Sequence, residues 1–187
     1  MTESFMQPFA LALAFDSGNL EPATSKVERR LSHMRGMYHD AEAEQAGLAA
    51  DPVIYEVLQY DVPAENGQLV VCTTVLQPGR VGDEYYMTKG HYHEKRDTGE
   101  VYVGLRGHGK LIMEVDGQSS NLDMAPGTVA YVPPYWAHRS VNVGDEPLIF
   151  LAVYPADAGH DYGTIERDGF SQRVLERSGT PAVVAVR

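Results

Sequence analysis

The chain is poor in cysteine, with Cys72 alone among 187 residues. A single thiol cannot form an internal disulfide, which favours a reducing compartment. Cys72 ends the apolar run Leu69–Cys72, so we interpret it as a packing residue, not a nucleophile. Residues Met1–Asp16 lack the basic region, apolar core and cleavage site of a secretory signal. No run approaches the roughly 18 apolar residues of a membrane span. We expect a cytoplasmic protein without membrane contact.

Positive charge is also scarce. Fifteen Lys and Arg residues face 26 Asp and Glu residues, giving a formal net charge of −11. Such a balance disfavours nucleic acid and anionic membranes as partners. An anionic substrate would therefore need a local site of backbone amides, hydroxyls and a few cations.

The sequence has no internal repeat, low-complexity tract or linker. We expect one domain over 1–187, with an N-terminal extension at 1–50 and a core at 51–187. The extension should hold a strand at Phe9–Phe15 and two short helices. Lys26–Met34 has helical spacing of its apolar residues, and Asp40–Ala50 is rich in Ala, Glu and Gln.

From Pro52 onward, short runs with strand propensity alternate with Gly, Pro, Asn and Asp turns. Regular short spacing of this kind predicts an all-β sandwich or barrel. The expected strands are Val53–Tyr60, Leu69–Leu76, Glu84–Thr88, Glu100–Arg106, Lys110–Val115, Ser119–Met124, Thr128–Val132, His138–Val143, Pro147–Tyr154, Gln172–Glu176 and Ala182–Val186.

Four side chains have the spacing of a metal site: His91, His93, Glu100 and His138. Residues two apart in an extended strand point to the same face, so His91 and His93 can reach one ion. Three imidazoles and a carboxylate complete the coordination shell of a first-row divalent metal, but they do not choose which one. Tyr102 shares a strand face with Glu100, so it should enter the same cavity.

The residues around these ligands resemble a known family. His91, His93, Glu100 and Gly107 match the first cupin motif, and Gly127, Pro133, His138 and Asn142 match the second. Three longer segments are more specific, and they closely resemble the cupin-type glucose-6-phosphate isomerases: Thr88–His93, Tyr131–Arg139 and Tyr154–Gly163. The resemblance covers most of the chain. It implies an all-β cupin jelly-roll barrel, a homodimer, and interconversion of glucose 6-phosphate and fructose 6-phosphate.

The resemblance also assigns roles by position. It implies one divalent metal per subunit, Fe²⁺ by preference with Mn²⁺, Ni²⁺ or Zn²⁺ as alternatives. Thr74, Thr88 and Gly90 fall at its phosphate contacts, beside which Lys89 could add a charge. The positions that line its sugar pocket are Tyr55, Tyr102, Tyr135, Tyr154, His160 and Tyr162.

Aldose–ketose isomerisation moves a proton between C2 and C1 and shifts two protons on oxygen. A metal that holds the C1 and C2 oxygens would stabilise the developing enediolate. Glu100 is then the candidate base for proton transfer through a cis-enediol, with Tyr154 and His160 moving the oxygen protons. A metal-assisted hydride shift, which needs no base, is the rival route.

Two other function classes share this ligand set. A cupin non-haem iron dioxygenase would consume O₂ and needs two adjacent open positions on the metal. A non-catalytic sugar-binding cupin would bind sugar without turnover. The polar tyrosines and the Thr-Lys-Gly segment favour a phosphorylated sugar and hence the isomerase.

Overall fold

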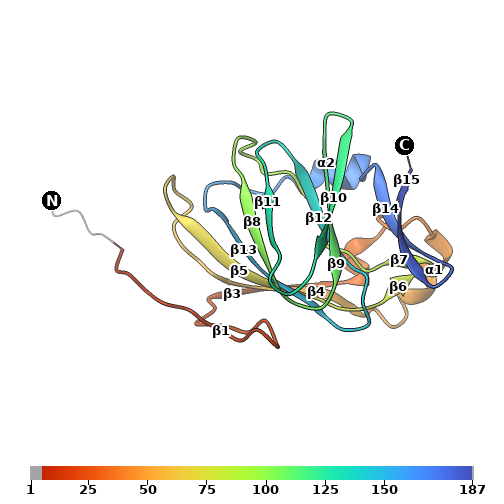
Figure 1. The fold of residues 1–187 in the computed structure, drawn as a ribbon, viewed down its shortest axis with the longest axis horizontal. Coiled ribbons are helices and arrows are strands. Elements are labelled where there is room, and N and C mark those ends of the chain that lie inside the picture. The colour runs from red at the N-terminus through yellow and green to blue at the C-terminus, as the bar shows by residue number, and fades with distance from the viewer. Residues whose placement is uncertain (1–5, 187) are drawn as a thin grey trace.

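The structure is a computed structural model that describes residues 6–186. Its regular structure is mostly antiparallel strands, which lie in separate sheets (Figure 1). The largest sheet has the order β11-β8-β13-β5-β4-β3. Its strands, in the same order, are Val129–Val132, Glu100–Arg106, Leu148–Pro155, Leu69–Leu76, Val53–Tyr60 and Ser25–Arg30. No helix within the described range is long and apolar enough to cross a membrane.

A smaller sheet has the order β10-β9-β12, from strands Gln118–Met124, Gly109–Val115 and Ala137–Asn142. Isolated bridges extend it beyond β12 through Met87 opposite Val141 and His91 opposite His138. Two further sheets have the orders β15-β14-β7-β6 and β1-β2. Their strands are Thr180–Ala185, Gln172–Arg177, Glu84–Tyr85 and Arg80–Val81, then Ala12–Leu13 and Leu20–Glu21.

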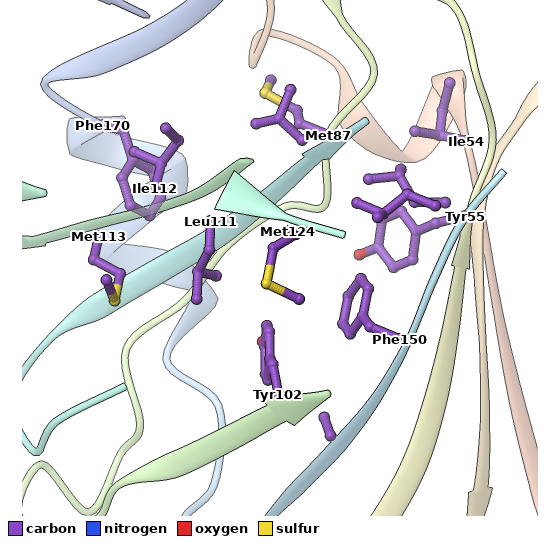
Figure 2. Packing of buried hydrophobic residues seen from close by; sticks show 14 of the residues in the cluster. Ile54, Tyr55, Met87, Tyr102, Leu111, Ile112, Met113, Met124, Phe150 and Phe170 are labelled. Atoms are coloured by element: carbon purple, nitrogen blue, oxygen red, sulfur yellow. The ribbon is translucent and has the colours of Figure 1, made fainter. Parts of the chain in front are cut away.

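The core lies between the six-stranded sheet and the three-stranded sheet β10-β9-β12. Tyr102 and Phe150 from the large sheet stack with ring centroids 4.9 Å apart. Figure 2 shows them beside Leu111 and Met124, which come from the small sheet. Strict strand alternation sends every second side chain inward, and this packing is the main source of stability.

The predicted all-β jelly-roll fold is confirmed, although the strands form separate sheets instead of one closed barrel. The predicted strands Val53–Tyr60, Leu69–Leu76 and Glu100–Arg106 coincide with β4, β5 and β8. A tight turn with positive φ at Asp116 and Gly117 joins β9 to β10. Asp-Gly is the dipeptide that such hairpin turns favour.

The N-terminal prediction is wrong in part. Lys26–Met34 is not an α-helix: β3 pairs with β4 along its length, and a 3₁₀ turn, Leu31–Met34, follows. Tertiary pairing outweighed a local helical pattern, because a short helix gains little stability on its own. The strand expected at Phe9–Phe15 is reduced to Ala12–Leu13.

Two short helices flank the sheets. The predicted helix at Asp40–Ala50 is confirmed as α1, Ala41–Gly47, whose N-terminus is capped by Asp40 through the Ala43 amide at 2.9 Å. A second helix, α2 at Tyr162–Asp168, was not predicted. Asp161 caps it by accepting from the Thr164 amide at 3.1 Å.

Candidate active site

The four predicted metal ligands come together inside the molecule. The ligand atoms of His91, His93, Glu100 and His138 all lie within 4.8 Å of one another. His91 and His138 sit directly opposite in an antiparallel bridge, with reciprocal backbone hydrogen bonds of 3.2 and 3.1 Å. Glu100 reaches them from the start of β8, in the other sheet. The segment at His91–His93 forms isolated bridges and not a regular strand, yet it brings both rings to one point, as expected for an extended backbone.

Backbone and hydroxyl groups orient the rings from behind. His93 Nδ1 lies 3.1 Å from the Thr98 carbonyl and 2.8 Å from the Thr98 hydroxyl. His138 Nδ1 lies 3.3 Å from the Trp136 carbonyl. An Nδ1–H that donates to a carbonyl leaves the Nε2 lone pair free, which is the usual arrangement of metal-ligating histidines.

The inward-facing nitrogens support this interpretation. Nε2 of His91 and Nε2 of His138 are buried and have no hydrogen-bond partner among residues 6–186. His138 Nε2 is 2.9 Å from Glu100 Oε2, but not in hydrogen-bond geometry. His93 Nε2 is 3.2 Å from the same oxygen. Buried polar atoms normally have partners, and a cation bound at this point would supply one. The donor set therefore fits a divalent transition metal.

Electrostatics keep the cluster in the protonation states that a metal requires. Burial, reinforced by His138 and His160, holds the pKa of His91 well below its ordinary value. Burial alone would raise the pKa of Glu100, but His138 and His93 outweigh burial and the net shift is downward. Near neutral pH, His91 is therefore neutral and Glu100 is a carboxylate.

A cavity of about 210 Å³ opens from the cluster, and most of the predicted sugar-pocket residues line it. The His160 ring centroid is 4.5 Å from that of His91 and 5.4 Å from that of Tyr154. The His160 and Tyr162 rings are stacked at 5.7 Å. The Tyr154 hydroxyl donates to Gln59 at 3.3 Å. The cavity thus places hydroxyl and imidazole groups next to the metal ligands.

His160 and three tyrosines of the cavity are held neutral. Burial lowers the pKa of His160 and raises that of Tyr154. Burial raises the pKa of Tyr162 to about 12 and sets that of Tyr102 well above its ordinary value. These groups can exchange hydrogen-bonded protons without carrying charge at neutral pH.

The predicted phosphate residues are divided. Thr74 and Thr88 line the cavity. Gly90 has φ +73, and a Cβ there would lie 2.6 Å from the Phe170 ring and 3.0 Å from the His138 carbonyl oxygen, so only glycine fits. Lys89 does not line the cavity, because its Nζ pairs with Glu166 at 2.6 Å.

Tyr135 is not brought to the cavity. Its side chain is 57% exposed, and it is absent from the lining. Its φ of +76 is unusual for a bulky residue and follows from its place in the Pro133–Trp136 turn. Sequence reasoning treated the aromatic residue in this segment as a pocket residue, whereas the turn directs it outward.

Sequence reasoning missed Arg29 and Gln59, which also line the cavity, as does the buried Cys72. Strand alternation along β3 would have placed Arg29 on the same face as Val27, but the helical interpretation of that segment hid it. Burial, followed by the charge of Glu100, raises the pKa of the Cys72 thiol, which suits an inert packing residue.

Comparison with known proteins identifies the family of this chain. A family model described as glucose-6-phosphate isomerase matches residues 28–184. The glucose-6-phosphate isomerases of Thermococcus litoralis and Pyrococcus horikoshii are each 50% identical to this chain. The alignments cover 96% of the chain and 95% and 96% of those proteins, respectively. A putative glucose-6-phosphate isomerase 2 of Rhizobium meliloti is 41% identical over 88% of the chain and 84% of its own length.

A solved structure of a Bacillus subtilis oxalate decarboxylase variant superposes on 55% of this chain and 26% of its own. The TM-score is 0.45 and the identity is 25%. The family model spans most of the chain, and half of the aligned residues are identical over nearly the full length of two relatives. This chain therefore belongs to the cupin-type glucose-6-phosphate isomerase family.

Proposed function

We propose that this chain interconverts glucose 6-phosphate and fructose 6-phosphate with one divalent metal bound by His91, His93, Glu100 and His138. The observation that carries the proposal is the shared cavity, whose lining holds His91, Glu100 and His138 of the four-residue cluster beside Tyr154 and His160. Thr74 and Thr88 also line it. We propose Fe²⁺ as the native ion, with Mn²⁺, Ni²⁺ and Zn²⁺ as alternatives, and the cytoplasm as the compartment. When bound, the metal would act as a Lewis acid that polarises the sugar's carbonyl end.

The residues then divide the remaining work. Glu100 is ionised and lines the cavity, so it would be the base that moves the proton between C2 and C1 through a cis-enediol. The lowered pKa of Glu100 makes its carboxylate a weak base. Tyr154 and His160 are neutral, and they move the protons on oxygen. In the rival route, hydride shifts directly between the carbons and Glu100 serves only as a ligand.

Arg29 completes the phosphate end of the cavity. It is the cationic side chain of the lining, on β3 and close to Tyr55, whose pKa it lowers against the larger effect of burial. We propose that Arg29 and the hydroxyls of Thr74 and Thr88 receive the phosphate, with the Gly90 amide. A charged donor here offsets the net negative field of the protein.

The deciding assay couples glucose 6-phosphate formation to a reporter enzyme after chelation and single-metal reconstitution. We expect chelation to abolish turnover and at least one first-row divalent ion to restore it. Turnover unchanged in protein shown by elemental analysis to be metal-free would reject the metal role. Oxygen uptake by the iron-loaded protein would instead favour the dioxygenase.

Running the reaction in deuterated water separates the two hydrogen-transfer routes. Solvent deuterium on C1 or C2 of the product supports Glu100 as base, since a carboxylate proton exchanges with water. Complete absence of carbon-bound label under conditions of full turnover supports the hydride shift.

We also propose that the chain forms a homodimer through the outer face of the large sheet. Val129 and Tyr131 on the edge strand β11 are 70% and 57% exposed. They pair with Val103 and Val101 of β8, so their side chains form an apolar stripe on that face. Analytical ultracentrifugation of a Tyr131→Glu variant should show monomer where the parent protein shows dimer. A Leu122→Glu variant on the small sheet is the control.

A further inference from the structure

A second hollow of about 210 Å³ lies behind β12. Its lining includes Arg139 and Arg173, together with the end of α2 and the turn that follows it. Arg139 follows His138 in β12, and neighbouring side chains of a strand point to opposite faces. The hollow is therefore separated from the metal cluster by the strand itself.

Arg139 has an unmet hydrogen-bonding need. Its side chain is buried, with 4% exposure, and its guanidinium carbon lies 4.6 Å from the centre of the Phe170 ring. One nitrogen, Nη2, donates to the Lys89 carbonyl at 2.6 Å. Nε is buried and has no partner among residues 6–186. A buried charged donor without a partner is costly, so an unfilled position beside it calls for a ligand.

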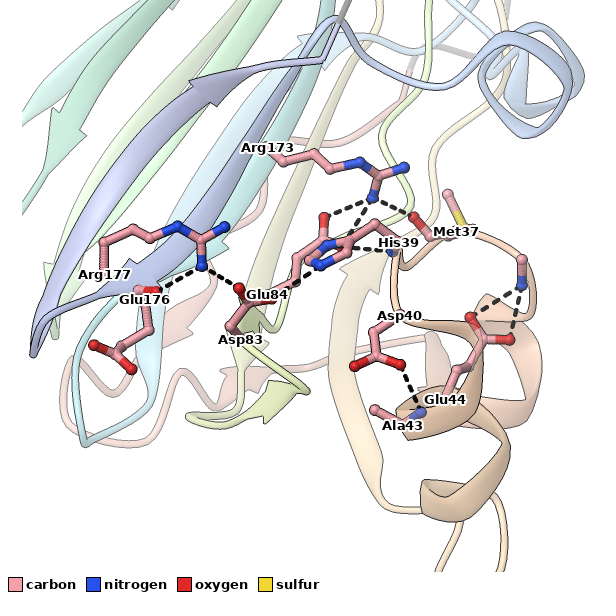
Figure 3. Close-up of polar contacts among 11 residues, drawn as sticks. Met37, His39, Asp40, Ala43, Glu44, Asp83, Glu84, Arg173, Glu176 and Arg177 are labelled. Atoms are coloured by element: carbon pink, nitrogen blue, oxygen red, sulfur yellow. Dashed lines mark hydrogen bonds and ion pairs between the residues drawn. The ribbon is translucent and has the colours of Figure 1, made fainter.

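Arg173 brings a second guanidinium to the same hollow. Its Nη1 donates to both Glu84 carboxylate oxygens at 2.8 Å and to the Met37 carbonyl at 2.9 Å. Figure 3 shows these contacts converging on that one nitrogen. Within the described part of the chain, Nε and Nη2 of Arg173 make no hydrogen bond, so two donors of its planar fork remain available.

The acidic residues around the hollow are already engaged. Glu166 accepts from Lys89 at 2.6 Å, and Asp168 pairs with Arg167 at 2.7 Å. Glu84 is buried and is held by Arg173. The hydrogen-bond donors that remain available in the hollow therefore belong to the cationic side chains of Arg139 and Arg173. Guanidinium groups match the oxygens of phosphate particularly well.

We propose that this hollow binds a small oxyanion of the phosphate class between Arg139 and Arg173, as a site separate from the substrate cavity. This binding does not depend on catalysis, so its test does not use turnover.

The probe is inorganic phosphate, titrated calorimetrically into the full-length protein and followed by ³¹P line broadening. We expect two phosphates per chain, one in each cavity. Thr88→Val should weaken the first without changing the second. Arg173→Lys keeps a positive charge beside Glu84 but removes the guanidinium fork. It should therefore weaken binding of the second phosphate by about tenfold or more. Arg177→Lys, four residues along β14 and outside the hollow, is the matched control and should retain both.

A Glu84→Gln/Arg173→Gln double variant guards against a folding artefact, because it removes the buried charge pair together. Near-UV circular dichroism identifies the variants that are folded. Loss of the second phosphate in folded Arg173→Lys or in the folded double variant supports the proposal. A single phosphate that Thr88→Val removes, or a second phosphate with unchanged affinity in both Arg173 variants, overturns it and leaves the hollow to water.

Discussion

The two ends of the cavity, where we propose that a metal and a phosphate bind, offer different kinds of binding groups. The metal end has buried ring nitrogens that lack partners and converge on one point, and each of His93 and His138 is fixed from behind by a carbonyl. The phosphate end has hydroxyls and one cation, Arg29, while its other cation, Lys89, is already paired. Buried ring nitrogens with free lone pairs can bind a metal tightly and rigidly. Neutral hydroxyls contribute only modestly to the binding of a phosphate. Changes at the metal end should therefore cost far more than changes at the phosphate end.

The largest expected effect comes from the metal end. His138→Ala should lower turnover by about a thousandfold or more, since it removes a ligand and the Lewis-acid contribution of several kcal/mol. Steady-state kinetics together with metal content measure this loss. His108→Ala, an exposed turn histidine, is the control and should keep full activity. Near-parental turnover in a folded His138→Ala variant would contradict the metal site.

Residues that orient the ligand rings should contribute less to metal affinity than the ligands themselves. Thr98→Val removes the hydroxyl that lies 2.8 Å from His93 Nδ1 but keeps the Thr98 carbonyl contact. We expect metal affinity to fall by about ten- to a hundredfold, measured by competition with a chelator. Thr98→Ser, which keeps the hydroxyl, should bind metal like the parent. Equal affinity in all three proteins would show that the hydroxyl does not orient the ring.

The phosphate end should respond with a weaker substrate interaction and intact chemistry. Thr88→Val should raise KM for glucose 6-phosphate by about tenfold with kcat little changed, because it removes one hydroxyl from a neutral site. Thr88 also accepts from the Ser140 amide at 3.1 Å, so Thr88→Ser is the control that preserves both contacts. An unchanged KM would remove Thr88 from the phosphate site, and a collapse of kcat would place it with the chemistry instead.

Acid should lower the folding stability of the metal-free protein, because His91 and Glu100 must take up protons. Burial lowers the pKa of His91 below its ordinary 6.5, so the unfolded chain binds protons that the folded chain does not as pH falls below that value. Glu100 acts in the same direction at lower pH, from its ordinary 4.5 downward, because its pKa is lowered in the fold. The Tm should fall by a few degrees between pH 7 and 5.5, and His91→Gln should flatten this part of the profile.

The smallest effect tests the residue that the turn directs outward. Tyr135→Phe should change kcat and KM by less than about twofold, since its exposed side chain lies outside the cavity. Tyr154→Phe, which removes a hydroxyl inside the cavity, is the contrasting variant and should slow turnover. A large loss in Tyr135→Phe alone would show that Tyr135 moves into the cavity when substrate binds.

Strands were predicted well where side-chain alternation and turn chemistry agree. β4, β5 and β8 have the predicted bounds because each is a run of strand formers that ends at a turn signal. The segment at Lys26–Arg30 was predicted incorrectly, because its polar and apolar residues fit a helix nearly as well as a strand. The open edge of β4 decided between them.

The sequence by itself predicted the four candidate ligands, the bounds of several core strands and the family, because spacing and residue type are local and chemically specific. Tertiary structure alone decided that Arg29 enters the cavity while Lys89 and Tyr135 stay out of it. It also decided that Arg139 and Arg173 meet behind β12. These outcomes depend on strand pairing, ion-pair partners and turn direction between residues far apart in the chain, and no local pattern encodes them.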